Sequence, residues 1–265
     1  MKVVVIIPAA GLGTRMAPVP SAPIPGAQTP GSQISSTKDA QAKKAPPSKQ
    51  FTELGGTPIL IHTLRKFAAV EAVSEIWIAL RENEMEGFRE RLSSSAADVL
   101  NKDVLKKKVE LVVGGEHRQQ SVANALNALT AAPDDIVLVH DAVRPLVAPE
   151  IIHEVIEAAK KYGAAIAGLP AFDTVKQVER TAAGAVIKAT IPRAGIVLAQ
   201  TPQGFRYSVI KKAFDEAAAD GFTGTDEASL AERSGHEVAV VMGSARNIKI
   251  TTPADMELAE FYLRK

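Results

Sequence analysis

Residues 3–16 read VVVIIPAAGLGTRM: five β-branched residues, a turn of small residues, and then an arginine. The β-branched run is typical of a buried strand, because such side chains pack well on a pleated surface. Small side chains let the backbone amides of the turn approach a phosphate closely, and Arg15 adds a planar cation for phosphate oxygens. The stretch therefore predicts a strand followed by a polyphosphate-binding loop.

Two better-known glycine loops do not fit this stretch. The dinucleotide fingerprint needs a third glycine where the chain has Met16. The P-loop pattern GxxxxGK[ST] is absent from residues 8–16. For the loop taken alone, an ordinary strand–turn–helix corner without a ligand is the alternative interpretation.

The composition excludes several classes of function. The 31 Lys and Arg residues nearly balance 30 Asp and Glu residues, a net charge of +1, whereas dedicated nucleic-acid binders are usually strongly basic. The chain has no cysteine, which excludes disulfides, thiolate zinc sites and a cysteine nucleophile, and suits a cytoplasmic location. No apolar run approaches membrane-spanning length, so we expect neither nucleic acid nor membrane as a partner.

Strand and helix patterns alternate along most of the 265 residues. Strands are expected at 3–7, 76–80, 109–113, 136–139, 164–169, 237–242 and 247–250. Helices are expected from a Thr57–Pro58 cap, at 85–107, at 120–130, at 151–159 with Gly163 as C-cap, from Thr225 to Gly235, and from a Thr252–Pro253 cap to Tyr262. This alternation predicts an α/β fold with a mainly parallel sheet and helices on both faces. In such sheets, ligands bind at the carboxyl ends of the strands.

Residues 17–48 differ in composition from the rest of the chain. They hold seven of the 16 prolines, five serines and no aromatic residue, so they bury too little apolar surface to offset the entropy of ordering. We expect a low-complexity insertion without ordered structure. The functional alternative is a lid over the phosphate site, with Lys38, Lys43 and Lys44 as additional cations.

The sequence pattern of residues 172–192 predicts a β-arm, a hairpin of two strands. Thr174–Arg180 and Ala185–Ile191 are typical of two short strands joined by a turn. A two-stranded hairpin with little core of its own needs a surface to pack on. That surface is either a second subunit or another part of the same chain.

Five further clusters fall at loop positions, and each has a structural alternative. Residues 114–121 (GGEHRQQS) suit an anion or a base edge, or form a helix cap; residues 140–145 (HDAVRP) suit a substrate and metal site, or a structural ion pair. Arg193 is either a ligand or a solvated arginine. Residues 225–227 form either a site or a helix cap. Lys249 is either a phosphate ligand or a lysine on an edge strand. The histidines lack metal-ligand spacing, and no nucleophile–base pair is evident. Cations and glycine turns suit phosphoryl or nucleotidyl transfer, which depends on positioning and charge neutralisation.

Taken together, these motifs resemble one enzyme family. PAAGLGTRM, SKQF, GGEHRQQSV, VHDAVRP, DTVK, IPR, QTPQ, TDEASL and NIKIT occur in the order seen in the 2-C-methyl-D-erythritol 4-phosphate cytidylyltransferases of isoprenoid synthesis. The resemblance covers almost the whole chain except residues 17–48. It implies one Rossmann-like nucleotidyltransferase domain over residues 1–265, CTP and methylerythritol phosphate as substrates, Mg²⁺, and a homodimer with swapped β-arms.

Transferred position by position, the resemblance also implies three groups of site residues. The catalytic cations would be Arg15, Lys49 and Lys249. The nucleotide would contact Ala9, Ala10, Gly11, Gly13, Gly115, Glu116, Arg118 and Ser121. The methylerythritol phosphate would contact Asp141, Arg144, Thr174, Arg193, Thr201 and Thr225. Asp141 would also lie beside the metal, and Thr174 would reach into the partner subunit's site.

The chain departs from the family pattern at two places. Residues 17–48 separate Met16 from Lys49, where relatives have a short loop, so Lys43 and Lys44 compete with Lys49; the Gln50–Phe51 pair that follows favours Lys49. Glu116 replaces the aspartate of many relatives.

Two other functions are alternatives: a ribitol-5-phosphate (polyol phosphate) cytidylyltransferase and a catalytically silent nucleotide-binding protein.

Overall fold

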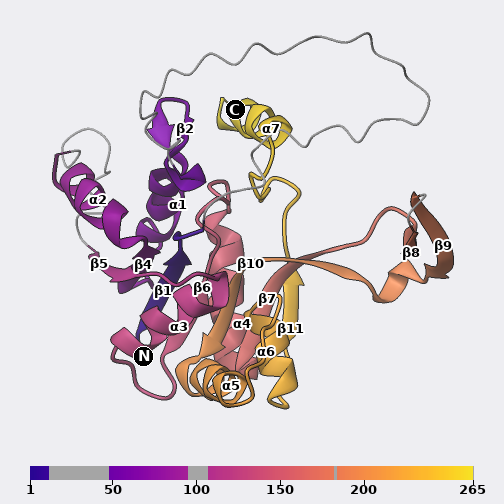
Figure 1. The fold of residues 1–265 in the computed structure, drawn as a ribbon. Helices are drawn as coiled ribbons and strands as arrows, with labels where there is room; N and C mark the ends of the chain where they lie inside the picture. The colour runs from indigo at the N-terminus through magenta and orange to yellow at the C-terminus, as the bar shows by residue number, and fades with distance from the viewer. Residues whose placement is uncertain (12–47, 95–106, 182–183, 265) are drawn as a thin grey trace, which may run out of the picture.

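A seven-stranded sheet forms the centre of the molecule (Figure 1). Its order is β11-β7-β10-β6-β1-β4-β5, and every neighbouring pair is parallel except those of β10, which runs antiparallel to β6 and β7. The strands are β1 (Val3–Pro8), β4 (Glu75–Leu80), β5 (Lys108–Val113), β6 (Ile136–Val139), β7 (Ala164–Pro170), β10 (Val197–Arg206) and β11 (Ala239–Met242). The expected α/β architecture is confirmed.

The computed structural model describes residues 1–11, 48–94, 107–181 and 184–264. The predictions for Gly13, Arg15 and nearly all of the 17–48 insertion lie outside the described residues, as does most of the second half of the helix expected at 85–107.

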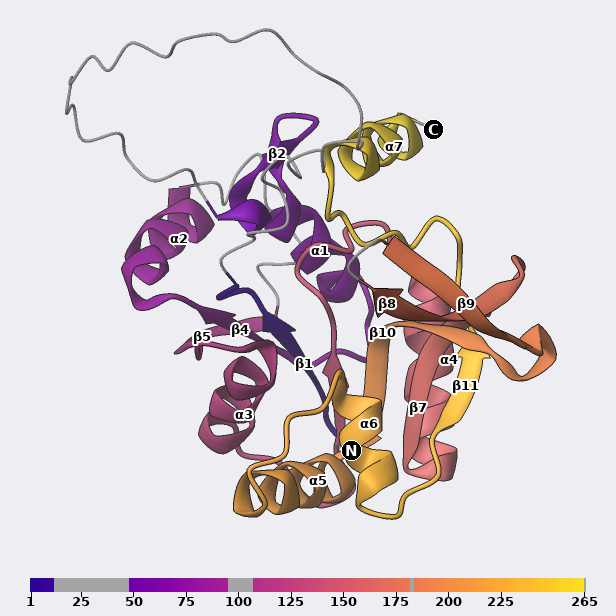
Figure 2. The ribbon, with the colours of Figure 1, turned by 45° about the vertical axis from the view of Figure 1, so that its right-hand side comes forward.

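Helices cover both faces of the sheet, because successive side chains of a strand point to opposite sides. Val3, Val5 and Ile7 of β1 pack against α1 (Ile59–Ala68), α2 (Glu82–Ser94) and α4 (Pro149–Tyr162). Val4 and Ile6 pack on the other face, against α3 (Arg118–Ala128), α5 (Tyr207–Ala219) and α6 (Glu227–Arg233). Figure 2 shows α3, α5 and α6 grouped together. None of the described helices is both long and apolar enough for a membrane span.

A third, smaller core lies beyond the carboxyl edge of the sheet. The helix α7 (Pro253–Leu263) packs over the short hairpin β2 (Glu53–Leu54) and β3 (Thr57–Pro58) through Leu54, Ile59, Ile250 and Ala259. As predicted, α7 begins at Thr252, whose hydroxyl accepts the Asp255 amide in a capping box. This core joins the segment that follows Lys49 to the segment that follows Lys249.

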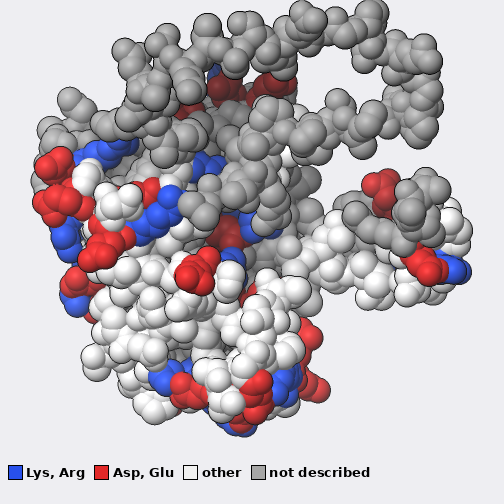
Figure 3. All heavy atoms as spheres, viewed as in Figure 1, with Lys and Arg blue, Asp and Glu red and all other residues white. Residues whose placement is uncertain are grey.

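The predicted arm is a hairpin that projects from the body of the molecule (Figure 1). Its strands β8 (Val175–Thr181) and β9 (Gly184–Ile191) are antiparallel. Val178, Val186 and Ile187 are exposed on it, and Figure 3 shows a projection whose stem is uncharged and whose far end carries acidic and basic side chains. The hairpin is confirmed, and it places apolar side chains in solvent.

Two local expectations are wrong. Residues 247–250 are not a strand, because their backbone bonds to the loop after β6: the Ile250 amide donates to the Val143 carbonyl, and the Arg144 guanidinium donates to the Asn247 carbonyl. Thr57 does not cap α1, because Thr57 and Pro58 pair with β2 and Pro58 itself occupies the N-cap position.

One central strand was not predicted from the sequence. Strand β10 contains the buried polar residues Gln200, Thr201 and Gln203, which hide the period-2 pattern of a half-buried strand. Their polar atoms find internal partners: for example, the Gln203 amide donates to Asp226 and accepts from the Ala228 backbone. These hydrogen bonds offset the free-energy cost of burying polar groups.

Candidate active site

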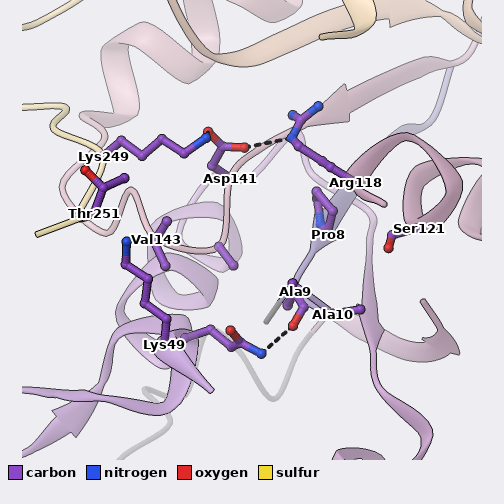
Figure 4. Close-up of a pocket in the computed structure, with 13 residues that line it drawn as sticks. Pro8, Ala9, Ala10, Lys49, Arg118, Ser121, Asp141, Val143, Lys249 and Thr251 are labelled. Carbon is purple, nitrogen blue, oxygen red and sulfur yellow. Dashed lines mark hydrogen bonds and ion pairs between the residues drawn. The ribbon is translucent and has the colours of Figure 1, made fainter. Parts of the chain in front are cut away.

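The loops that leave β1, β5 and β6 meet at the carboxyl edge of the sheet and line a cleft (Figure 4). The cleft consists of two adjoining cavities of about 190 and 300 Å³. Arg118, Asp141 and Lys249 line both of them. Figure 4 shows Lys49 and Lys249 on one side of the first cavity and Ala9 and Ser121 on the other.

The turn after β1 forms one wall of the first cavity. Ala9, Ala10 and Gly11 line it, and the Ala9 amide continues the sheet by donating to the Ala79 carbonyl at 2.8 Å. The turn packs closely against Gly114, where an added Cβ atom would lie 2.3 Å from the Ala10 Cβ. Glycine at position 114 therefore allows the turns after β1 and β5 to lie side by side.

Lys49 enters the cavity from a single turn of 3₁₀ helix (Lys49–Phe51). The neighbouring Gln50 is almost completely buried, and its side-chain amide donates to the Ala9 carbonyl and, at 3.4 Å, to Glu84. Gln50 thus ties the lysine-bearing turn to the end of β1. In the sequence, Gln50 served only to identify the lysine, and no local pattern predicted this contact.

Asp141 is a buried carboxylate at the centre of the cleft. Its Oδ1 atom accepts from the Arg118 Nε at 2.9 Å, and its Oδ2 atom lies 2.8 Å from the Lys249 Nζ and 3.4 Å from the Arg144 Nε. Burial raises the pKa of Asp141, but Arg118, Lys249 and Arg144 outweigh it and hold that pKa well below its usual range. The carboxylate is therefore ionised and orients three cations.

Arg118 is the first residue of α3 and has a second carboxylate partner. Its Nη1 atom donates to both oxygens of Glu227, at 2.7 and 2.8 Å. The prediction that residues 225–227 form a helix cap is right, because the Asp226 side chain caps α6. The pairing of Glu227 with Arg118 was missed, since the two residues are 109 positions apart.

The second cavity brings Arg144, Thr201 and Thr225 beside Asp141. The Thr201 hydroxyl accepts the Asp141 amide at 3.1 Å and lies 3.1 Å from Nδ1 of His140. The other ring nitrogen of His140 lies 3.0 Å from the Arg144 carbonyl; because a carbonyl only accepts, Nε2 carries the proton and Nδ1 accepts from Thr201. Burial lowers the pKa of His140 to about 4, which keeps this ring neutral.

Comparison with known proteins shows which family the chain belongs to. The profile of one family, 2-C-methyl-D-erythritol 4-phosphate cytidylyltransferase (IspD), matches residues 39–265. The chain belongs to this family. Proteins of that name from Acidobacterium capsulatum and Solibacter usitatus are 55% and 48% identical over the whole chain, and the matches cover 98% and 97% of their own lengths.

Solved structures of this cytidylyltransferase family share the fold. The crystal structure from Francisella tularensis has a TM-score of 0.72 at 32% identity, covering 98% of this chain and 99% of that one. The structure from Thermus thermophilus has a TM-score of 0.68 at 30% identity, and the match covers both chains completely. The predicted family and the Rossmann-like fold are confirmed.

Some predicted site residues do not line the cleft. Among the described residues, Gly115, Glu116, Thr174 and Arg193 line neither cavity. The Gly115 amide donates to the Ser121 hydroxyl at 3.0 Å, which places Gly115 just behind the wall, and Glu116 is exposed. Thr174 and Arg193 are exposed at the base of the arm, where the Arg193 guanidinium donates to the Phe172 carbonyl.

Proposed function

We propose that this chain transfers CMP from CTP to 2-C-methyl-D-erythritol 4-phosphate and releases pyrophosphate, a step of isoprenoid precursor synthesis by the non-mevalonate route. The observation that carries the proposal is the group of three cations held by the buried Asp141 at the carboxyl edge of the sheet. A cleft rich in fixed positive charge, in a chain of this family, suits the reaction of two phosphate-bearing substrates.

The reaction needs no covalent enzyme intermediate. An oxygen of the sugar phosphate bonds to the α-phosphorus of CTP while the bond from that phosphorus to the bridging oxygen of the β-phosphate breaks. We assign Lys49 and Lys249 to the phosphates that gain charge as pyrophosphate leaves, because both line the first cavity. Arg15 completes the catalytic set in the proposal.

In the proposal, each of the two cavities binds one of the two substrates. Ala9, Ala10 and Gly11 offer a close-packed turn to the triphosphate, and Gly13, Gly115, Glu116, Arg118 and Ser121 complete the nucleotide site of the proposal. Arg144, Thr201 and Thr225 line the second cavity beside Asp141, which suits the sugar phosphate. The in-line reaction then takes place where the two cavities share Asp141 and Lys249.

The proposal includes Mg²⁺. Asp141 is the one carboxylate among the described residues that line the first cavity, and the described chain holds no group of three His, Asp or Glu side chains suited to a metal. Mg²⁺ usually binds one or two carboxylates and the phosphates of a substrate, so Asp141 fits as a single protein ligand. When bound, Mg²⁺ neutralises phosphate charge; Asp141 itself positions Arg118 and Lys249.

We also propose a homodimer in which the arm of one protomer lies over the cleft of its partner. The exposed Val178, Val186 and Ile187 favour a covered arm, because a hairpin of two strands is marginally stable in water. The arm would carry Thr174 and Arg193 to the partner's substrate. A cytoplasmic location completes the proposal, since a chain without cysteine suits a reducing compartment.

A pyrophosphate-release assay tests the function. With CTP, Mg²⁺ and methylerythritol phosphate, we expect turnover that depends on all three. Turnover with ribitol 5-phosphate and none with methylerythritol phosphate would instead identify a polyol phosphate enzyme. CTP binding without any product would identify a silent nucleotide-binding protein.

A further inference from the structure

Glu227 is a buried carboxylate with no role in the reaction proposed above. It is 1% exposed and occupies the first position of α6, directly after the residue that caps this helix. Because the capping is done by Asp226, the helix start does not itself require a carboxylate at Glu227. Burial raises the pKa of Glu227, while Arg118 opposes that shift. The ion pair with Arg118 therefore stabilises the negative charge of Glu227 in its buried position.

That partner, Arg118, is held between two carboxylates. Glu227 accepts from the Nη1 atom at 2.7 and 2.8 Å, and Asp141 accepts from the Nε atom at 2.9 Å. Two acceptors on two different atoms of the planar guanidinium determine its plane as well as its position. Among the described residues no acceptor bonds to the Nη2 atom, and Arg118 lines both cavities of the cleft.

The position of Glu227 is itself connected to the central sheet. Gln203 of β10 donates to Asp226 at 2.8 Å and accepts the Ala228 amide at 3.0 Å. The residues on both sides of Glu227 are therefore attached to a strand next to β6, and β6 leads directly to Asp141. The two carboxylates that hold Arg118 thus share one rigid support.

We propose that Glu227 is a positioning residue that orients Arg118 toward the nucleotide. Glu227 also neutralises part of the positive charge of Arg118, so that Asp141 neutralises less of it. Asp141 then remains available to hold Lys249 and Arg144. The inference rests on the proposed function, because it takes CTP as the ligand that meets Arg118.

Calorimetric titration with CTP and Mg²⁺ tests this role without turnover. Glu227→Gln keeps the shape of the side chain and removes its charge, and we expect CTP to bind at least about tenfold more weakly, the ratio for losing a hydrogen bond to a charged group. Glu232→Gln makes the same change at an exposed position of α6, and we expect wild-type affinity. Thermal melting shows that the variants compared are folded; a purely structural role would lower the melting temperature and leave the affinity of the folded protein unchanged.

A double-mutant cycle separates positioning from an independent effect. If Glu227 acts through Arg118, then Glu227→Gln adds less than about a twofold loss of affinity in an Arg118→Gln background, since coupled residues are not additive. Wild-type affinity in the folded Glu227→Gln protein, or fully multiplied losses in the double variant, would overturn the inference.

A second variant covers the case in which Glu227→Gln does not fold. Glu227→Asp keeps the charge and withdraws the carboxylate by one methylene, and we expect a CTP affinity below that of the wild type. Unchanged affinity in Glu227→Asp would likewise overturn the inference. Absence of CTP binding by the wild-type protein would instead contradict the proposed function itself.

Discussion

At the scale of single residues, the charge of the cleft depends on Asp141, whose single negative charge is smaller than the summed positive charge of the cations around it. Asp141 has three cationic partners, and Glu227 shares only the charge of Arg118. The cleft therefore retains a surplus of positive charge, which a triphosphate and a sugar phosphate suit. Because Asp141 keeps two partners when one is removed, single cations can be tested without unpairing it.

Lys249→Ala is expected to abolish most turnover in a folded protein. Its Nζ atom bonds to Asp141 in a half-exposed position, and a group that stabilises charge in the transition state contributes about 3–4 kcal/mol, a rate factor on the order of 10²–10³. Pyrophosphate release measures the rate. Lys212→Ala removes an exposed lysine of α5 as the control, and a similar rate in the two variants would contradict the role of Lys249.

His140 makes stability depend on pH in a defined window. Its pKa is about 4 in the folded chain against 6.5 for an unperturbed histidine, so between these values the unfolded chain binds a proton that the folded chain does not. The free energy of unfolding should fall as pH drops from 6.5 toward 4, by up to about 3 kcal/mol from this residue.

Urea unfolding at about pH 7.5 and about pH 5, on either side of the ordinary histidine pKa, measures the effect. We expect His140→Gln to lose less stability between these two pH values than the wild type. His153→Gln, at an exposed position of α4, should keep the wild-type difference. An equal loss of stability in wild type and His140→Gln would show that His140 does not titrate in this window.

At the scale of elements, the sequence patterns located most helices because their ends carry specific residues. Gly163 closes α4 in the left-handed region, with φ of 90°, and Thr252 begins α7 in a capping box. Both were predicted from local chemistry. Strand β10 was missed because its buried polar residues hide the strand pattern, and the partners of the Gln200 and Gln203 side chains are distant in the sequence.

Two glycine substitutions should change stability in opposite directions. Gly163→Ala meets no close atom, since Val209 lies 3.8 Å from the added Cβ, but the left-handed conformation costs about 1 kcal/mol for a residue with a side chain. Gly87→Ala lies within α2 in open space and should stabilise the protein by roughly 0.5–1 kcal/mol. Urea unfolding compares the two variants, and a change of the same sign in both would contradict this account.

At the scale of the whole molecule, the arm separates two groups of predicted substrate residues. Thr174 and Arg193 lie at its base, whereas Asp141, Arg144, Thr201 and Thr225 line the cleft. One chain does not bring the two groups together in the described structure. A swapped dimer would unite them, and it would also cover the apolar side chains of the arm.

Mixing two inactive variants tests the swapped arm. Lys249→Ala impairs a chain's own cleft, and Arg193→Ala impairs the partner's cleft. After the two variants are unfolded and refolded together, half of the dimers carry one intact site, so about a quarter of wild-type turnover should return. No recovery in a mixture that sedimentation shows to be dimeric would mean that each chain completes its own site.

The sequence by itself determined the alternation of strands and helices, the family, and the loops that carry Lys49 and Asp141. These features depend on local periodicity and on short motifs, which neighbouring residues specify. Only the tertiary structure decided where β10 enters the sheet, that residues 247–250 follow the loop after β6, and that Glu227 holds Arg118. Such contacts join residues far apart along the chain, and they form only when the packed core brings those residues together.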